Sequence, residues 1–165
     1  MYKRQGYGKG VNASGFACFA LAMIVSRLLG DKTLDRLGPA MTVKLGAYIG
    51  GIAWGAAILI AVPLSDSHPL IALIIINLGF IVVGFGIGPM FPAFILAAGA
   101  TPGVAPAVAI ARVGVIGIAG YFFGPTLTGL ISEVTGLPTA LFFPIVMLFL
   151  AGYLSRTIHT DKDRN

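Results

Sequence analysis

Long apolar runs, separated by short polar turns rich in proline and glycine, dominate the chain from residue 14 onward. Runs such as Leu70–Ile76 and Ile81–Ile87 do not alternate between apolar and polar positions, as the strands of a membrane barrel would. Helices and closed barrels are the structures that pair all their backbone groups in lipid. The pattern therefore predicts membrane-spanning helices.

We predict an all-α integral membrane protein with five transmembrane helices. The stretch 67–111 has 45 residues, and His68 is its only acidic or basic side chain. At about 1.5 Å per residue, one helix of this length would be twice as long as a bilayer is thick, so the stretch must fold back. The turn is expected at 99–106, and kinks are expected at Pro89 and Pro92. The expected segments are a polar tail at 1–13, a helical bundle at 14–155 with spans at about 14–30, 41–62, 70–98, 107–133 and 139–155, and a cytoplasmic tail at 156–165.

Charge is densest in one stretch between the first two apolar runs, at residues 27–39. Ionised side chains cost several kcal/mol at the bilayer centre, so this stretch is expected to be an aqueous loop. It would end the first span and begin the second.

Composition places the chain in lipid: 57% of residues are hydrophobic and 10% are charged, against about a quarter charged in soluble domains. The net charge of +5 does not indicate nucleic-acid binding, because the basic residues gather at span ends and form no stripe. Cys18 is alone and lies in an apolar run, which favours a small buried thiol over a redox or metal role. We expect no cofactor, no metal and no enzymatic activity.

The distribution of basic residues predicts the orientation. With five spans, the 31–40 loop, the 99–106 turn and the C-terminus share one side, which carries eight of the 11 basic residues and is therefore cytoplasmic. Lys3, Arg4 and Lys9 would lie outside, against the same rule, so we expect a preceding span and a chain that is part of something longer. The expected location is the bacterial inner membrane, with the C-terminus in the cytoplasm.

Glycine is abundant, with 23 residues, and several are spaced for close contact between helices. The i, i+4 pairs predicted to pack helices are Gly46 with Gly50, Gly51 with Gly55, and Gly120 with Gly124, the last followed by Pro125. An alternative interpretation is flexibility for alternating access.

The charged stretch resembles a known signature. Asp35-Arg36-Leu-Gly38 between two spans is similar to the core of the cytoplasmic loop motif of the major facilitator superfamily, in its copy between helices eight and nine. Two positions depart from the motif: Asp31 occupies an expected glycine position, with Gly30 one place earlier, and Pro39-Ala40 replaces a basic pair.

A second stretch, Gly117–Leu137, resembles helix eleven and its outer loop in sugar-type and fucose-permease-like members. The resemblance covers the chain from about Asn12 onward. It implies helices eight to twelve of a twelve-helix secondary transporter, with the N-terminal half and helix seven absent.

The resemblance implies a conformational latch at the loop, and the alternative is a solvated loop without function. The gating-loop candidates are Arg27, Gly30, Asp31, Asp35, Arg36 and Gly38. Three further polar or aromatic residues lie within spans and are candidates for the substrate path: Asn77, Arg112 and Tyr121. Arg112 could instead reach the lipid headgroups, Asn77 could bond a neighbouring helix, and Tyr121 could face lipid.

The favoured function is secondary active transport of a small solute, driven by an ion gradient with proton coupling as one expectation. The chain would be inactive alone, with the missing N-terminal half and the lipid bilayer as partners. Any proton-carrying site would lie in the absent half, because the chain's carboxylates lie near span ends. The alternative is a stand-alone structural or assembly protein that forms oligomers through its glycine-rich helix faces.

Overall fold

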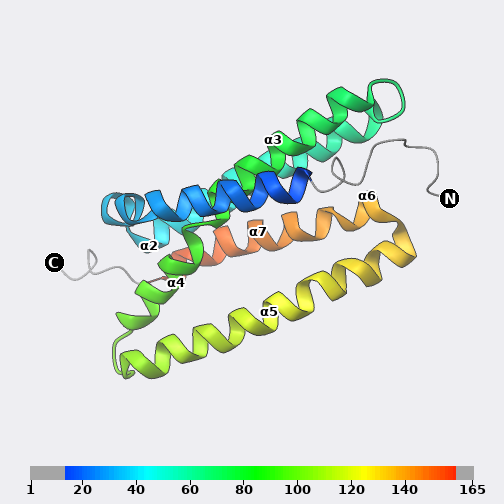
Figure 1. Cartoon of the computed structure of the whole chain (residues 1–165). Coiled ribbons are helices and arrows are strands. Elements are labelled where there is room, and N and C mark those ends of the chain that lie inside the picture. Colours follow the sequence, from blue (N-terminus) through cyan, green and yellow to red (C-terminus); the bar gives the residue numbers. More distant parts are fainter. Residues whose placement is uncertain (1–13, 159–165) are drawn as a thin grey trace.

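The computed structural model describes residues 14–158, and this part of the chain is helical apart from short turns, with no β-strand (Figure 1). The all-α prediction is therefore confirmed for these residues. Residues 1–13 and 159–165, which hold most of both predicted tails, lie outside the described part. The elements in chain order are α2 (Ser14–Leu64), α3 (Pro69–Ile87), α4 (Met90–Gly99), α5 (Pro106–Thr135), α6 (Leu137–Ala140), α7 (Phe142–Leu154) and the 3₁₀ helix η1 (Ser155–Thr157).

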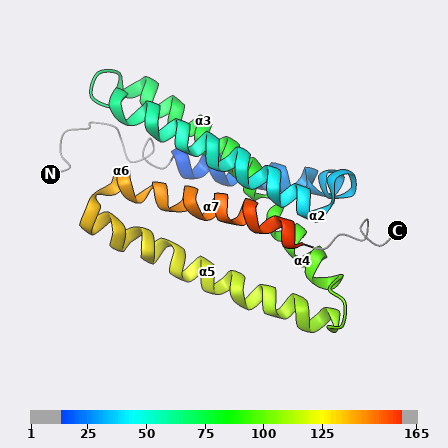
Figure 2. The same cartoon turned by 180° about the vertical axis from the view of Figure 1, so that it is seen from behind.

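Helix α2 has 51 residues but is not one straight rod, because Gly38 has a non-helical φ of 72° and ψ of 167°. Two arms, residues 14–37 and 39–64, meet at this glycine and fold back beside α3 (Figures 1 and 2). The hydroxyl of Thr42 donates a hydrogen bond of 2.7 Å to the Gly38 carbonyl at the start of the second arm. A backbone with positive φ at a single glycine thus reverses the chain.

This geometry corrects the expectation of a loop over 31–40. Residues 31–37 remain helical, because they contain no glycine or proline and include good helix formers such as Lys32 and Arg36. Charge moves a helix end out of the hydrocarbon, but it does not unwind the helix.

The number of spans also differs from the expected five. Four helices in the described residues are long and apolar enough to cross a membrane, at Ser14–Leu64, Pro69–Gly99, Pro106–Thr135 and Leu137–Thr157. The expected first and second spans are both contained in α2, which counts once.

The third expected span is interrupted where α3 ends and α4 begins, at Gly88 and Pro89. Proline has no N–H to continue the helical hydrogen bonds, which accounts for the break at Pro89. Pro92 causes no second break, because it lies in the first turn of α4, where that N–H would have no helical partner.

Glycines bring both arms of α2 into close contact with α3. Gly46 of the second arm faces the backbone of Gly86, and a Cβ added to Gly84 would lie 2.6 Å from the carbonyl oxygen of Phe19 in the first arm. Small residues at such contacts let helix backbones approach closely in lipid, where van der Waals packing drives association.

Aromatic side chains connect the same helices to the start of α7. The rings of Trp54 and Phe80 have centroids 4.5 Å apart, and Phe19 meets Phe80 edge-on at 6.4 Å. The indole N–H of Trp54 donates a hydrogen bond of 3.3 Å to the Leu141 carbonyl. Trp54 is only 6% exposed, so this cluster lies in the core.

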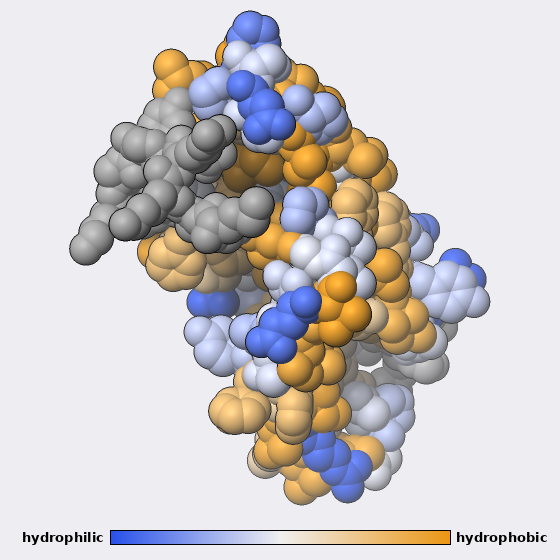
Figure 3. Space-filling view, turned by 90° about the vertical axis from the view of Figure 1, so that its right-hand side faces the viewer, coloured by the Kyte–Doolittle hydropathy of each residue, from blue (hydrophilic) through white to orange (hydrophobic). Residues whose placement is uncertain are grey.

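Helix α5 lies apart from the rest of the bundle, and Figures 1 and 2 show it separated from α2 and α3 along most of its length. Ala109 is its one buried residue. Its contacts are mainly with its chain neighbours α4 and α6. Apolar side chains are exposed widely over the molecule, as the orange surface in Figure 3 shows, and Tyr121 of α5 is 86% exposed. Exposed apolar surface of this extent suits a lipid surrounding or contact with further helices.

Candidate solute cavity and gating loop

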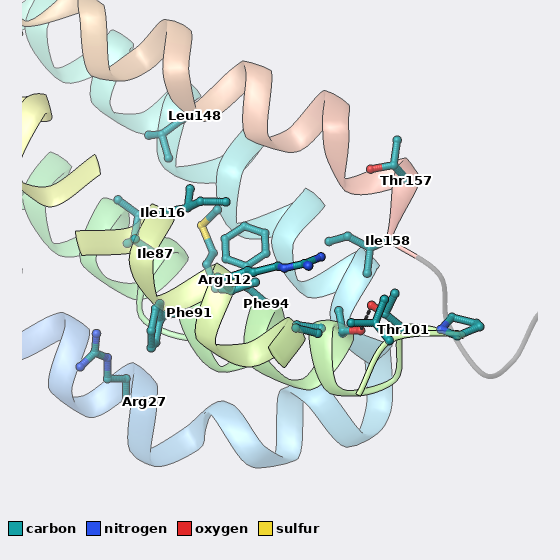
Figure 4. Close-up of a pocket in the computed structure, with 18 residues that line it drawn as sticks. Arg27, Ile87, Phe91, Phe94, Thr101, Arg112, Ile116, Leu148, Thr157 and Ile158 are labelled. Atoms are coloured by element: carbon teal, nitrogen blue, oxygen red, sulfur yellow. Dashed lines mark hydrogen bonds between the residues drawn. The ribbon is translucent and has the colours of Figure 1, made fainter. Parts of the chain in front are cut away.

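A cavity of about 780 Å³ lies between α5 and the rest of the bundle, and we call it the arginine cavity. Its lining comes from α2, α3, α4, α5, α7 and the η1 end of the chain (Figure 4). Most of the lining is apolar, including Phe91, Phe94 and Ile116. Its size is in the range that holds drug-sized ligands.

A second cavity of about 850 Å³ continues along α5 toward α6, and we call it the aromatic groove. Trp54 and Phe80 line it from the bundle, and Phe123 lines it from α5. Ile87 and Leu148 line both cavities, so the two are neighbours along one open side of α5.

Arg27 and Arg112 both line the arginine cavity, from the first arm of α2 and from α5. In Figure 4 the guanidinium of Arg112 is directed into the cavity, toward the side that carries Ile158, and Arg27 lies at the opposite edge. The sequence assigned these residues to different groups, one to the gating loop and one to the substrate path. The structure places them at one cavity, a relation that no local pattern indicates.

Asn77 does not line either cavity. Its amide exchanges hydrogen bonds with the hydroxyl of Ser14, with Nδ2 donating at 3.2 Å and Oδ1 accepting at 3.3 Å. The structure therefore corresponds to the alternative in which Asn77 bonds a neighbouring helix. Tyr121 also lies outside both cavities, because it projects from the exposed face of α5.

The gating-loop residues lie around the turn of α2. Gly30 is buried, and a Cβ there would contact the Cβ of Pro89 at 3.7 Å. Asp31, Asp35 and Arg36 are exposed, and within residues 14–158 none of these three side chains forms an ion pair or hydrogen bond. A latch through Asp35 would therefore need a partner outside the described residues or another conformational state.

The three predicted glycine pairs face different surroundings. Gly51 and Gly55 face α7, where an added Cβ would lie 3.4 Å from Phe149 and 3.6 Å from Ile145, respectively. Gly46 and Gly50 face α3, and a Cβ added to Gly50 would lie 3.7 Å from the Cα of Val83. Gly120 and Gly124 have no described atom within 4 Å of an added Cβ, and together with Pro125 they line the aromatic groove. The pair in α5 therefore faces open space and does not contact another helix of the described chain.

Two curated relatives are similar to this chain over most of its length. A Yersinia pestis protein named an uncharacterized MFS-type transporter is 35% identical over 136 residues, which is 82% of this chain and 32% of the relative. A Rhizobium meliloti protein named membrane protein MosC is 27% identical over 137 residues, covering 83% of this chain and 31% of the relative. The chain thus spans about a third of the length of these relatives.

No family model matches the chain, and no solved structure does. The described helices of membrane-spanning length and apolar composition indicate a multi-pass membrane protein, and the two relatives are named as an MFS-type transporter and a membrane protein. The chain is thus similar to about a third of a protein named as an MFS-type transporter.

Proposed function

We propose that this chain forms helices eight to twelve of a major facilitator transporter that moves a small solute across a bacterial inner membrane. The observation that carries the proposal is the 35% identity, over 136 residues, to an MFS-type transporter. In this arrangement the two arms of α2 serve as helices eight and nine, and α5 serves as helix eleven. The sugar-type and fucose-permease-like members are the proposed subtype, on the pattern of Gly117–Leu137.

The open side of α5 supports a solute path between this chain and a companion half. Both cavities lie along that side, and the chain alone supplies one side of the path. The transporter's remaining helices would supply the other, so the isolated chain is proposed to be inactive.

Ion-gradient coupling would depend on that companion half. In the described part of the chain, the carboxylates are Asp31, Asp35, Asp66 and Glu133, and none lines either cavity. A proton-carrying site, if protons drive transport, would therefore be contributed from outside this chain.

The turn at Gly38 is the proposed gate element, with the charged residues from Arg27 to Arg36 beside it. Basic residues gathered at this end of the bundle support a cytoplasmic location for the turn and for the C-terminus. Asp35 would pair with a cation of the companion half in one conformational state.

The test is uptake by proteoliposomes that contain the chain together with the remaining N-terminal part of the Yersinia pestis relative, assayed with a panel of radiolabelled sugars and drug-like solutes. We expect uptake of at least one solute by the pair and no uptake by either part alone. Uptake by the chain alone would contradict the one-sided path. Absence of uptake by the pair, with both parts inserted, would count against transport.

Asp35→Asn is the informative variant in the same assay. It removes the charge but preserves the side-chain shape, so it should slow uptake several-fold without changing membrane insertion. Asp66→Asn removes a carboxylate at the opposite turn, far from Gly38, and is the matched control that should leave uptake unchanged. Equal rates for Asp35→Asn and the unmodified pair would remove the latch from the proposal.

A further inference from the structure

The charged side chains that line the arginine cavity, among the described residues, all have the same sign. Among the described residues that line it, two are charged, Arg27 and Arg112, and both are cations. Neither forms an ion pair with a carboxylate in residues 14–158. Both arginine side chains are exposed in the described chain. Two cations of the same sign at one apolar cavity attract an anion and repel a cation, so the cavity favours an anion.

The rest of the lining restricts what kind of anion fits. Phe91, Phe94 and Ile116 present apolar and aromatic surface, and the cavity volume of about 780 Å³ exceeds what a small inorganic ion needs. Within residues 14–158, the other polar side chains of the lining are two threonines, and the hydroxyl of Thr101 already donates to the Ala97 carbonyl at 3.3 Å. Such a lining offers few hydrogen bonds to the many hydroxyls of a sugar.

We infer that the arginine cavity binds an amphipathic organic anion, with one carboxylate or phosphate held by Arg112 and an apolar body against Phe91, Phe94 and Ile116. Arg27, at the opposite edge, contributes longer-range attraction. The inference rests on the proposed function in treating the cavity as part of a solute path, and it names the substrate class. The proposed sugar-type and fucose-permease-like subtype then describes the sequence pattern of Gly117–Leu137, whereas the cavity is assigned an organic anion as its solute.

An arginine guanidinium suits this role because its planar donors bind a carboxylate or phosphate in a bidentate manner. The same chemistry is offered by a free organic acid and by an anionic lipid headgroup. The backbone position of Arg112, about a turn and a half into α5 from Pro106, allows either to reach it.

The test measures binding directly, so it does not depend on transport. The chain is placed in phosphatidylcholine nanodiscs, and binding of radiolabelled 2-naphthoate is compared with its neutral analogue 2-naphthamide, with empty nanodiscs subtracted. We expect saturable binding of the naphthoate alone, weakened roughly tenfold or more by Arg112→Gln, because a hydrogen-bonded charge is lost. Arg27→Gln should weaken it less, by about two- to threefold, since its contribution is longer-range.

The matched control is Lys44→Gln. Gly46 packs on Gly86 and Ser26 packs on Gly88, so Lys44 lies at about the same level of the bundle as Arg27. Lys44 carries the same charge but lines neither cavity, so its replacement should leave binding unchanged. Arg112→Lys keeps the charge without the bidentate geometry and should restore part of the affinity, which separates loss of charge from loss of folding.

A second arm identifies the source of the anion, using native mass spectrometry to count phosphatidylglycerol retained by the chain and by Arg112→Gln. Naphthoate binding that depends on Arg112 assigns the cavity to a free organic acid. Lipid retention that depends on Arg112, without naphthoate binding, assigns it to a lipid headgroup. Equal binding of the amide, or no Arg112 dependence in either arm, would overturn the inference. Transport could fail in the uptake assay while this binding persists, so the two proposals fail independently.

Discussion

At the residue scale, closeness of approach distinguishes glycines that look alike in the sequence. Gly84 lies so close to the first arm of α2 that an added Cβ would be 2.6 Å from the Phe19 carbonyl oxygen and 2.9 Å from the Cβ of Ala22. Gly129 of α5 has no described atom within 4 Å of the same added atom. Both residues are helical, so the difference between them is a matter of packing and not of helix propensity.

Replacing each of these glycines by alanine should therefore affect stability differently. Gly84→Ala is expected to destabilise the chain by about 1–3 kcal/mol, because two backbones must separate. Gly129→Ala should be neutral or stabilising by up to about 1 kcal/mol, because alanine is the better helix former. The check is the thermal unfolding midpoint of each variant in detergent. A lower midpoint for Gly129→Ala than for Gly84→Ala would contradict the packing described above.

At the element scale, Gly38 divides α2 into two helical arms. Its φ of 72° and ψ of 167° lie in a region that is essentially restricted to glycine. Pro39 follows directly and is buried, which fixes where the second arm begins. The charged residues on either side determine only which part of α2 stays out of the hydrocarbon.

Gly38→Ala is expected to cost about 1–3 kcal/mol, since a Cβ is strained in that backbone conformation. Gly114→Ala is the matched control, because Gly114 is helical, lacks a positive φ and has open space around it. The unfolding midpoint in detergent measures both variants. An unchanged midpoint for Gly38→Ala would mean that the two arms can meet in another way.

At the scale of the whole molecule, α5 is the least buried of the long helices in the described chain. The helices themselves could be predicted from the sequence, because apolar runs of bilayer length are interrupted by proline and glycine. The helical state of residues 31–37 differs from the predicted loop, because charge places a segment in water without unwinding it. The two arginines at one cavity, and the pairing of Asn77 with Ser14 over 63 positions, are tertiary relations that periodicity does not contain.

The orientation of the molecule is testable by labelling single cysteines. In a chain with Cys18→Ala, Asp35→Cys should react with a membrane-impermeant maleimide only after the cells are permeabilised. Ser67→Cys, in the exposed turn between α2 and α3, should react in intact cells. This pattern follows from the excess of basic residues at the Gly38 end. Labelling of Asp35→Cys in intact cells would reverse the orientation.

Trp54 is the chain's single tryptophan, and it lines the aromatic groove while its ring packs on Phe80. Indole fluorescence shifts to shorter wavelength when apolar atoms replace the water around the ring. The protein therefore carries an intrinsic optical reporter at the place where α5 leaves the bundle. The emission wavelength of Trp54 therefore distinguishes two states of the aromatic groove. In one state water fills the groove, and in the other it is filled by lipid, by a companion helix or by a second copy of α5.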